Sequence, residues 1–284
     1  MPFESEENEV RTYLCDGWEE YIIEVKKERV MPLEGGFRGS STVLFRGHSD
    51  STWKLSSTLE RDLLIPGAHR ENSDELLNLR QMNGVKWYEE QCDMIYSRFS
   101  ENATGLPDLH MCRSDIDRWV IGRHYGLLSP YLDWTRSPFV AAFFAYEKAY
   151  KVYEGLRSGY PSNFDGFVTV WGLRFWDEAP LCDEFELTDP VTSHATRPRA
   201  QCGAFTKLTS AKHIDLESYF RSRSLAHYLE RYDVSLRDAT TAFRDLELMN
   251  ISYLTLFPDV AGAAWSANMQ THWLKYGHMI AAAS

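Results

Sequence analysis

The stretch Thr135-Arg136-Ser137-Pro138, followed by FVAAFFAYEKAYKVY at residues 139–153, decides the fold class more than any other part of the chain. Ser137 can cap a helix, because its hydroxyl can accept a main-chain N–H of the first turn. Pro138 suits the first helical position, where its missing N–H leaves no bond unmade. The sequence therefore predicts a helix from Pro138, with one buried face and one face in solvent.

Strands are predicted on both sides of this helix along the chain. Residues 41–45 (STVLF) combine β-branched and apolar side chains, and Arg46-Gly47 follows them, so we expect Arg46 at the end of a strand. Phe167 to Trp171 (FVTVW) alternates in the manner of a second strand. Arg46 would then stand where a ligand can reach it.

Helical spacing covers most of the remaining chain. The other expected helices are 8–28, 73–98, one that begins near Ser114 with Asp117 in a capping box, 214–231, 235–249 and one after Pro258. Residues 31–41 are expected as a loop. The pattern predicts an α+β fold, a helix-rich single domain around a small mixed or antiparallel sheet. We place an N-terminal helical lead at 1–36 and the main domain at 37–284.

Composition limits the function. The 284 residues carry 30 Lys and Arg against 41 Asp and Glu, a net charge of −11, which disfavours non-specific nucleic-acid binding by the whole molecule. The many aromatic residues exclude intrinsic disorder. The acidic N-terminus is unlike a signal peptide, and no apolar run approaches the roughly 20 residues that span a bilayer. We therefore predict no membrane partner.

The cysteines give no sign of a disulfide framework or a thiolate zinc site, because their number is odd and no pair has C-x-x-C spacing. They are Cys15, Cys92, Cys112, Cys182 and Cys202. Reduced thiols fit a cytoplasmic location. His48 and His124 lack metal-ligand spacing, so no metal is predicted. Nucleophile-elbow, Walker A and dinucleotide-binding glycine motifs are also missing from the sequence.

Three segments, residues 45–61, 122–145 and 197–207, crowd polar groups against glycines and aromatic residues. Their residues resemble the FRG domain family, named for its Phe-Arg-Gly motif. The matching residues are Phe45-Arg46-Gly47, His48, Asp50, Trp53, Leu55, Arg61, His124-Tyr125-Gly126, Leu132-Asp133-Trp134-Thr135, Ser137-Pro138 to Phe144-Ala145, Arg199, Gln201 to Thr206, Ile251-Ser252 and Leu256 to Asp259. The likeness runs from about residue 37 to residue 270.

One departure from the family pattern affects the expected site. The family has an arginine where this chain has Pro130, and a glutamine where it has Arg123. Arg123 lies next to His124 and could supply the missing charge. The family itself implies no established function.

The motifs also resemble those of ADP-ribosyltransferases of the arginine-serine-glutamate type. Phe45-Arg46-Gly47 is similar to their first-strand motif, and Asp133 to Ser137 followed by Ala142 to Ala145 is similar to their second. The resemblance implies an ADP-ribosyltransferase-like fold and NAD as substrate. It also implies a toxin-like enzyme with a macromolecular target and a regulatory or neutralising protein partner. In NAD, a pyrophosphate would suit the guanidinium of Arg46.

On this reading, the expected catalytic residues are Arg46, His124, Asp133 and Thr135. The expected cofactor-binding residues are Arg46, Gly47, His48, Tyr125, Trp134, Ser137 and Gln201. Gly47 would let the ligand approach the main chain, and Tyr125 or Trp134 would stack on the nicotinamide ring. Gly203 stands where the family pattern would place a catalytic glutamate, so Asp133 or Asp50 would have to serve.

Other interpretations remain open. The missing glutamate favours a non-catalytic binding module for a nucleotide, nucleic acid or peptide, whereas the crowded ionisable groups favour an enzyme, which we prefer. A nuclease-like or glycosidase-like enzyme would use Asp133, His124 and Asp50. Arg46 and Asp133 could instead form a structural salt bridge. A basic cluster is either a solvated face or a surface for an anionic partner, and its members are Arg197, Arg199, Lys207 and Lys212.

Overall fold

The structure is a computed structural model. It describes residues 8–30, 42–61, 74–106, 112, 114–155, 166–175, 183–188, 197, 200–210 and 212–281. In this part of the chain, one seven-stranded sheet has the order β1-β7-β4-β2-β3-β6-β5. Its strands are β1 (Arg11–Cys15), β2 (Thr42–His48), β3 (Tyr131–Thr135), β4 (Phe167–Phe175), β5 (Phe185–Thr188), β6 (Gly203–Leu208) and β7 (Leu229–Ser235).

The sheet is mixed, because β1 runs parallel to β7 while the other neighbouring strands are antiparallel. Helices surround it, so the predicted α+β class is confirmed. The helices are α1 (Trp18–Val30), α2 (Asp74–Asn102), α3 (Asp115–His124), α4 (Pro138–Gly155), α6 (Leu216–Ser222), α7 (Ala239–Leu248), α8 (Tyr253–Leu256) and α9 (Val260–Ala281), with the 3-10 turns η3 (Ala226–Tyr228) and η4 (Leu236–Asp238).

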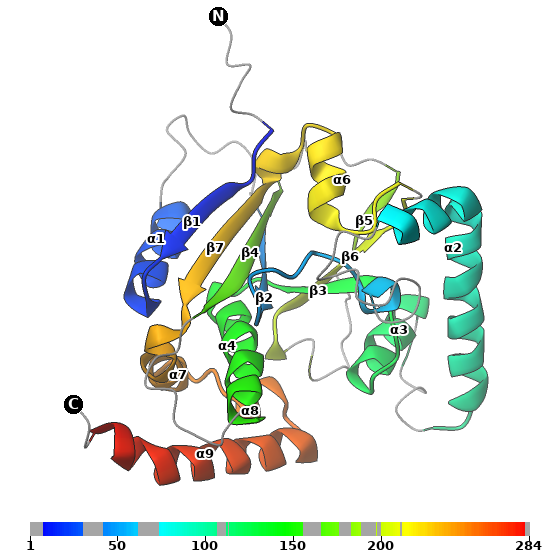
Figure 1. Cartoon of the computed structure of the whole chain (residues 1–284). Coiled ribbons are helices and arrows are strands. Elements are labelled where there is room, and N and C mark those ends of the chain that lie inside the picture. Colours follow the sequence, from blue (N-terminus) through cyan, green and yellow to red (C-terminus); the bar gives the residue numbers. More distant parts are fainter. Residues whose placement is uncertain are drawn as a thin grey trace, which may run out of the picture.

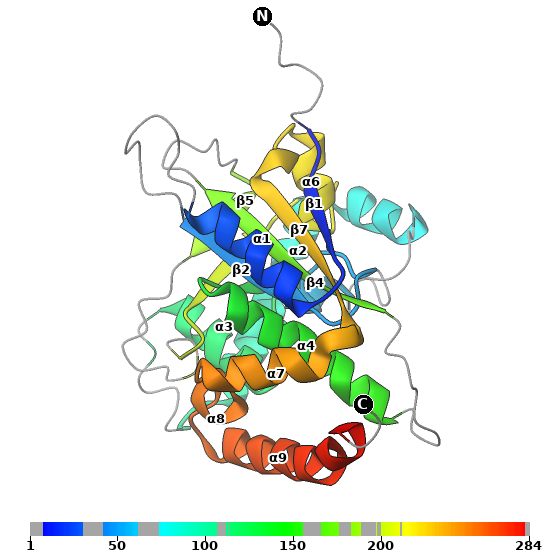
Figure 2. The same ribbon diagram turned by 90° about the vertical axis from the view of Figure 1, so that its left-hand side faces the viewer.

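The two faces of the sheet bury different side chains, because successive strand residues point to opposite sides. On one face, Phe45 and Tyr232 belong to a core that includes residues of α1, α4 and α7. On the other, Leu44 and Trp171 pack in a core with residues of α6. A third core joins α2 and α3 to β3 and β6. Figure 2 shows α1, α4 and α7 on the same side of the sheet.

The pairing between β2 and β3 is much shorter than the pairing between β2 and β4. Between β2 and β3, the ladder contains the single antiparallel pair Phe45–Thr135, whereas β2 and β4 are paired over seven positions from Thr42 to His48. In Figure 1, β3 runs across the direction of β2 and β4. The two strands therefore separate just where the sequence places Arg46 and Asp133.

Local signals at two helix starts are confirmed. Helix α4 begins at Pro138, and the Ser137 hydroxyl accepts the N–H of Val140 at 3.3 Å. Ser114 and Asp117 form the expected capping box at the start of α3. In both cases the signal depends on residues within one helical turn.

Two helix predictions were wrong where a strand formed instead. Residues 11–15 were expected in a helix but form β1, which pairs with β7, so the predicted helical lead 1–36 contributes a strand to the main sheet. The predicted helix 214–231 contains α6, and β7 begins at Leu229. Strand β7 lies between β1 and β4, and its charged residues are held by side chains of β4. Arg174 pairs with Glu230, and the Thr169 hydroxyl donates to Asp233, contacts that helical spacing along the chain does not reveal.

Smaller differences concern element boundaries. Arg46 lies two residues inside the end of β2, not at its last position. Strand β4 continues from Phe167 to Phe175. Helix α2 is interrupted at Gly84, whose φ is 73°. The predicted helices 235–249 and after Pro258 correspond to α7 and α9. The predicted loop 31–41 falls outside the described residues.

Helix α9 lies at the bottom of the molecule in Figures 1 and 2, beyond α7 and α8. In the described residues, no helix has both the length and the hydropathy needed to cross a membrane. The cysteines seen in this part of the structure, Cys15, Cys92, Cys112 and Cys202, are unbridged.

Candidate functional site

A cavity of about 520 Å³ opens where β2 and β3 separate. Helices α3 and α4, helix α8 and the start of α9 supply its other walls. Its volume falls within the range of small-molecule sites. Seven predicted site residues line it: Arg46, Gly47, His124, Asp133, Trp134, Thr135 and Gln201. The structure thus brings the four predicted catalytic residues together, as expected from their positions near element ends.

The Arg46 guanidinium bridges the gap between β2 and β3. Its Nη1 donates to the Asp133 carbonyl at 2.7 Å, and its Nε donates to His48 Nε2 at 3.1 Å. Burial lowers the pKa of Arg46 to about 9, with Arg123 and Arg61 acting in the same direction and Asp133 opposing them. The side chain is therefore charged at neutral pH and fixed in place by protein acceptors.

The Asp133 carboxylate forms its ion pair with Arg123, not with Arg46. Arg123 also donates to the Tyr131 carbonyl at 2.5 Å. Burial acts to raise the pKa of Asp133, but the charges of Arg123, Arg46 and His124 outweigh it and hold the pKa below its usual value. The alternative of an Arg46–Asp133 salt bridge is thus replaced by a bond from Arg46 to the main chain of Asp133.

His124 is a neutral group in the cavity wall. Burial lowers its pKa, and the charges of Arg197 and Arg123 add to this effect against those of Asp133 and Asp259. Its Nε2 is buried and has no hydrogen-bond partner among the described residues. Within the same residues, no group of three or more His, Cys, Asp or Glu is arranged to hold a metal ion.

Two predicted catalytic or binding groups instead stabilise the strand-to-helix turn. The Thr135 hydroxyl donates to the Gln201 carbonyl at 2.6 Å and accepts the Ser137 N–H at 3.1 Å. The Gln201 amide donates to the Leu256 carbonyl at 3.1 Å. Thr135 and Gln201 reach the cavity, but these hydrogen bonds connect β3 to α8 through the turn before β6. Ser137 does not line the cavity and acts as the cap of α4.

Four residues that were expected to contact the ligand, Tyr125, Trp134, His48 and Gly47, have other surroundings in the structure. Tyr125 caps the C-terminus of α3 with 73% of its surface exposed, outside the cavity. Trp134 reaches the cavity lining, but it is buried in the core, and its indole N–H donates to Thr206. His48 is buried behind Arg46. A Cβ at Gly47 would lie 2.0 Å from the Ala141 carbonyl oxygen, so this glycine permits close packing of α4 on β2.

The acid-base set Asp133, His124 and Asp50 is not assembled. Asp50 does not line the cavity, and its carboxylate accepts the N–H of Thr52 at 2.9 Å within a turn. The nuclease-like or glycosidase-like interpretation therefore loses one of its three residues.

The basic cluster is also divided: Arg197 lines the cavity while Lys212 is exposed, and Arg199 lies outside the described residues.

Sequence reasoning missed several cavity residues. Arg61 belongs to a matched motif and Arg197 to the basic cluster, so the sequence shows both charges. It does not show that the two side chains line the same cavity. Glu147 lies on the predicted α4 helix, but its burial to 7% exposure depends on contacts made by α8. An aromatic wall also closes the cavity, formed by Phe144, Tyr253, Phe257 and Trp265.

The side chains of the aromatic wall contact one another. The ring centroids of Phe257 and Trp265 are 5.1 Å apart, those of Phe144 and Phe257 5.9 Å, and those of Tyr253 and Trp265 5.8 Å. Arg197 lies over the Phe257 ring at 5.3 Å and pairs with Asp259 at 2.5 Å. The wall therefore offers flat apolar surfaces next to a fixed cation.

The cavity carries a positive excess. Four arginines line it, Arg46, Arg61, Arg123 and Arg197, against the carboxylates Asp133 and Glu147 in the lining and Asp259, which pairs with Arg197. Arginine recognises phosphate and carboxylate groups through directed N–H donors. This arrangement suits an anionic ligand that also carries an aromatic ring.

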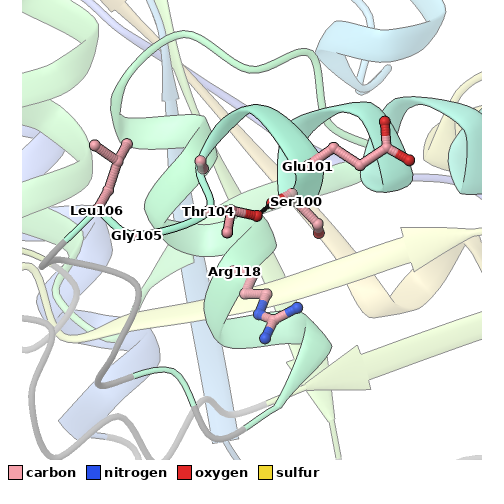
Figure 3. A pocket seen from close by; sticks show the side chains of 7 residues that line it. Ser100, Glu101, Thr104, Gly105, Leu106 and Arg118 are labelled. Atoms are coloured by element: carbon pink, nitrogen blue, oxygen red, sulfur yellow. Dashed lines mark hydrogen bonds between the residues drawn. The ribbon is translucent and has the colours of Figure 1, made fainter.

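A second cavity of about 420 Å³ lies between the end of α2 and helix α3 (Figure 3). Arg118 is its single arginine, and Thr104 Oγ1 donates to the Ser100 carbonyl at 3.0 Å. No predicted site residue lines this cavity. Substitutions in this cavity are therefore matched controls for substitutions in the first.

Comparison with known proteins gives one match. Residues 41–154 match the FRG domain family, a segment that runs from the start of β2 almost to the end of α4 and includes Arg46, His124 and Asp133. The motifs around Gln201 and Leu256 lie beyond it. No curated protein and no solved structure matches the chain. The likeness to ADP-ribosyltransferases stays a prediction.

Proposed function

We propose that this protein, whose residues 41–154 match the FRG domain family, binds NAD in the cavity and transfers its ADP-ribosyl group to a macromolecular target. The observation that carries the proposal is one cavity of about 520 Å³ that is lined by four arginines and by an aromatic wall. NAD combines the two matching features, a doubly charged pyrophosphate and flat heteroaromatic rings.

The arginines would bind the pyrophosphate. Arg46 and Arg123 are held by main-chain carbonyls, and the positions of both guanidinium groups are therefore fixed before a ligand arrives. Fixed cations lose little freedom on binding, which favours affinity for a polyanion. Arg61 lies close enough to Arg46 to influence its charge state and would extend the same phosphate site.

The aromatic wall would hold the nicotinamide ring. Stacking on Phe257 or Trp265 would orient the bond between the ribose C1′ and the ring nitrogen. When that bond breaks, its electron pair leaves with the nitrogen as neutral nicotinamide, and the ribose becomes an oxocarbenium-like cation. An oxygen or nitrogen atom of the target then attacks C1′ and loses its proton.

A non-catalytic nucleotide-binding module is the second candidate. It is favoured by Thr135 and Gln201, whose polar groups bond the protein itself, and by the pairing of Asp133 with Arg123. These groups would then hold the shape of the cavity without taking part in a reaction.

Measurements of NAD binding and of NAD turnover distinguish the two candidate functions. The protein would be incubated with NAD labelled in its adenylate phosphate and a cell lysate, while nicotinamide release is followed by chromatography and NAD binding by calorimetry. We expect label on a macromolecule together with nicotinamide release. Arg46→Gln should reduce NAD affinity by roughly tenfold or more, through the loss of a charge-assisted bond.

Arg118→Gln provides the matched control, because it makes the same substitution in the second cavity. Its affinity for NAD should equal that of the wild type. Binding without nicotinamide release would support the binding module instead. Absence of NAD binding would contradict the proposed substrate.

We further propose that the protein acts in the cytoplasm, where NAD is available and thiols such as Cys202 stay reduced. A toxin-like activity of this kind would require a regulatory or neutralising protein partner. Affinity capture of the intact chain from its native cells would test for such a partner.

A further inference from the structure

Glu147 is a carboxylate that enters the cavity from α4. It lines the cavity, its residue exposure is 7%, and the Tyr253 hydroxyl donates to its Oε1. Buried carboxylates are rare unless they are held by hydrogen bonds or have a function. Tyr253 is itself buried in the aromatic wall, so the orientation of the Glu147 carboxylate is fixed by the packing of α8 against α4.

Helix α4 packs on β2 through one face and enters the cavity with another. The Gly47 main chain lies so close to Ala141 and Ala145 that a Cβ there would be 2.7 Å from the Ala145 nitrogen. Glu147 is only two residues beyond Ala145 on the same helix. Two residues correspond to about 200° of helical rotation, so Glu147 lies on a different face of α4 from the one that packs on Gly47. There it lines the same cavity as Arg46 and accepts a hydrogen bond from Tyr253 of the aromatic wall.

A ligand that places phosphates on Arg46 and Arg123 and a ring on the aromatic wall must cross the intervening space with its ribose. Glu147 lines the cavity and is held by Tyr253 of the aromatic wall, whereas Asp133 is under the charges of Arg123 and Arg46. The negative charge of Asp133 is also balanced by its ion pair with Arg123. Of the two carboxylates that line the cavity, Glu147 is thus the one held by the aromatic wall, where the nicotinamide ring is proposed to bind.

We propose that Glu147 is the catalytic carboxylate of the NAD reaction and that Tyr253 is its positioning residue; this inference rests on the proposed function. As the C1′–nitrogen bond breaks, the Glu147 carboxylate stabilises the positive charge that develops on the ribose. When the target oxygen or nitrogen bonds to C1′, Glu147 accepts the proton that this atom loses and returns it to solvent. Nicotinamide leaves neutral, so charge and protons balance.

The test compares nicotinamide release with NAD binding in the intact chain. Glu147→Gln keeps the size of the side chain and an oxygen that can accept the Tyr253 bond. It should lower the rate of release by roughly 100-fold or more, while the dissociation constant for NAD changes by less than about threefold. Glu101→Gln, an exposed carboxylate of the second cavity, should leave both values unchanged.

Tyr253→Phe tests the positioning role separately. We expect a smaller loss of rate, about tenfold, with little change in the dissociation constant for NAD, because the carboxylate is present but less well oriented. A purely structural role would give the same loss of rate in the Glu147→Gln background, whereas a positioning role gives little further loss there. Circular dichroism of each variant shows whether its fold is retained.

The outcomes distinguish the inference from the function on which it rests. Normal release in a folded Glu147→Gln variant, with an active wild type, would overturn the role of Glu147 and leave the NAD reaction standing. A wild type that neither binds NAD nor releases nicotinamide overturns both. A loss of rate in folded Tyr253→Phe that is equally large in the Glu147→Gln background overturns the positioning role of Tyr253.

Discussion

One hydrogen-bonded group lies where β2 and β3 separate, formed by Arg46, Arg123 and Asp133. Arg46 uses the main chain of Asp133 as its acceptor, and Arg123 uses the carboxylate. Asp133 therefore holds two arginine side chains, because its main-chain carbonyl and its carboxylate are separate hydrogen-bond acceptors. The positions of both arginines thus depend on β3, but only that of Arg123 depends on the Asp133 side chain.

These two contacts predict the result of two double-mutant cycles. Asp133→Ala removes the ion-pair partner of Arg123 but keeps the carbonyl that Arg46 contacts. The cycle with Arg123→Ala should therefore give a coupling energy of about 1–2 kcal/mol, moderate because the Asp133 side chain is partly accessible. The cycle with Arg46→Ala should couple more weakly. Urea unfolding of the single and double variants measures both energies, and the reverse order would contradict the assigned bonds.

At the scale of elements, helix α4 holds the site together. It starts at the Ser137 cap beside Thr135, packs on Gly47 of β2, and carries Phe144 and Glu147 into the cavity. The distance between the arginine group and the aromatic wall is therefore set by how closely α4 approaches β2. The glycine of the Phe-Arg-Gly motif is required for that approach, because any larger side chain would collide with the helix backbone.

Gly47→Ala should separate α4 from β2. The added Cβ would lie 2.0 Å from the Ala141 carbonyl oxygen, where only a backbone shift can relieve the overlap. We expect the free energy of unfolding to fall by about 3 kcal/mol or more, because overpacking against main chain cannot relax through a rotamer change. Urea denaturation measures the loss.

Gly172→Ala on the neighbouring strand β4 is the control. Its Cβ would meet the Glu230 side chain at 3.2 Å, and a side chain can move by a few tenths of an ångström. The expected loss is about 1 kcal/mol. Equal losses at the two positions would show that close packing of α4 is not the reason for Gly47.

At the scale of the whole molecule, the N-terminal elements are part of the main core. Strand β1 pairs with β7 along five positions, and Trp18 and Tyr21 of α1 are fully buried beneath the same sheet face that α4 and α7 cover. Trp18 also donates to Asp245 of α7 at 2.8 Å. Residues 11–30 thus contribute to stability as well as to the sheet.

A chain that begins at residue 37 should not reach the native state. It would expose the edge of β7 and lose the burial of Trp18, Tyr21 and Val25, each worth roughly 1.5–3 kcal/mol, out of a typical total of about 5–15 kcal/mol. We expect a broad or missing unfolding transition and binding of a hydrophobic dye. A chain that begins at Asn8 retains β1 and α1 and serves as the control. A cooperative transition in the shorter chain would contradict this assignment.

The sequence by itself determined the features that depend on near neighbours. The start of α4 at Pro138, the capping box at Ser114 and the strand at Phe167 were predicted because caps and alternation involve residues only a few positions apart. The meeting of Arg46 with Asp133 in one cavity also followed, since both belong to recognisable motifs near element ends.

Only the tertiary structure decided which partner each element and side chain has. Residues 11–15 and Leu229–Ser235 form strands because they pair with each other, a contact across more than 200 positions that no local pattern records. Arg123 and not Arg46 takes the Asp133 carboxylate, because α3 ends beside β3. Glu147 becomes a buried cavity residue because α8 brings Tyr253 against it. Pairing, burial and charge balance are properties of elements that meet in space, and the order of residues along the chain does not fix which elements meet.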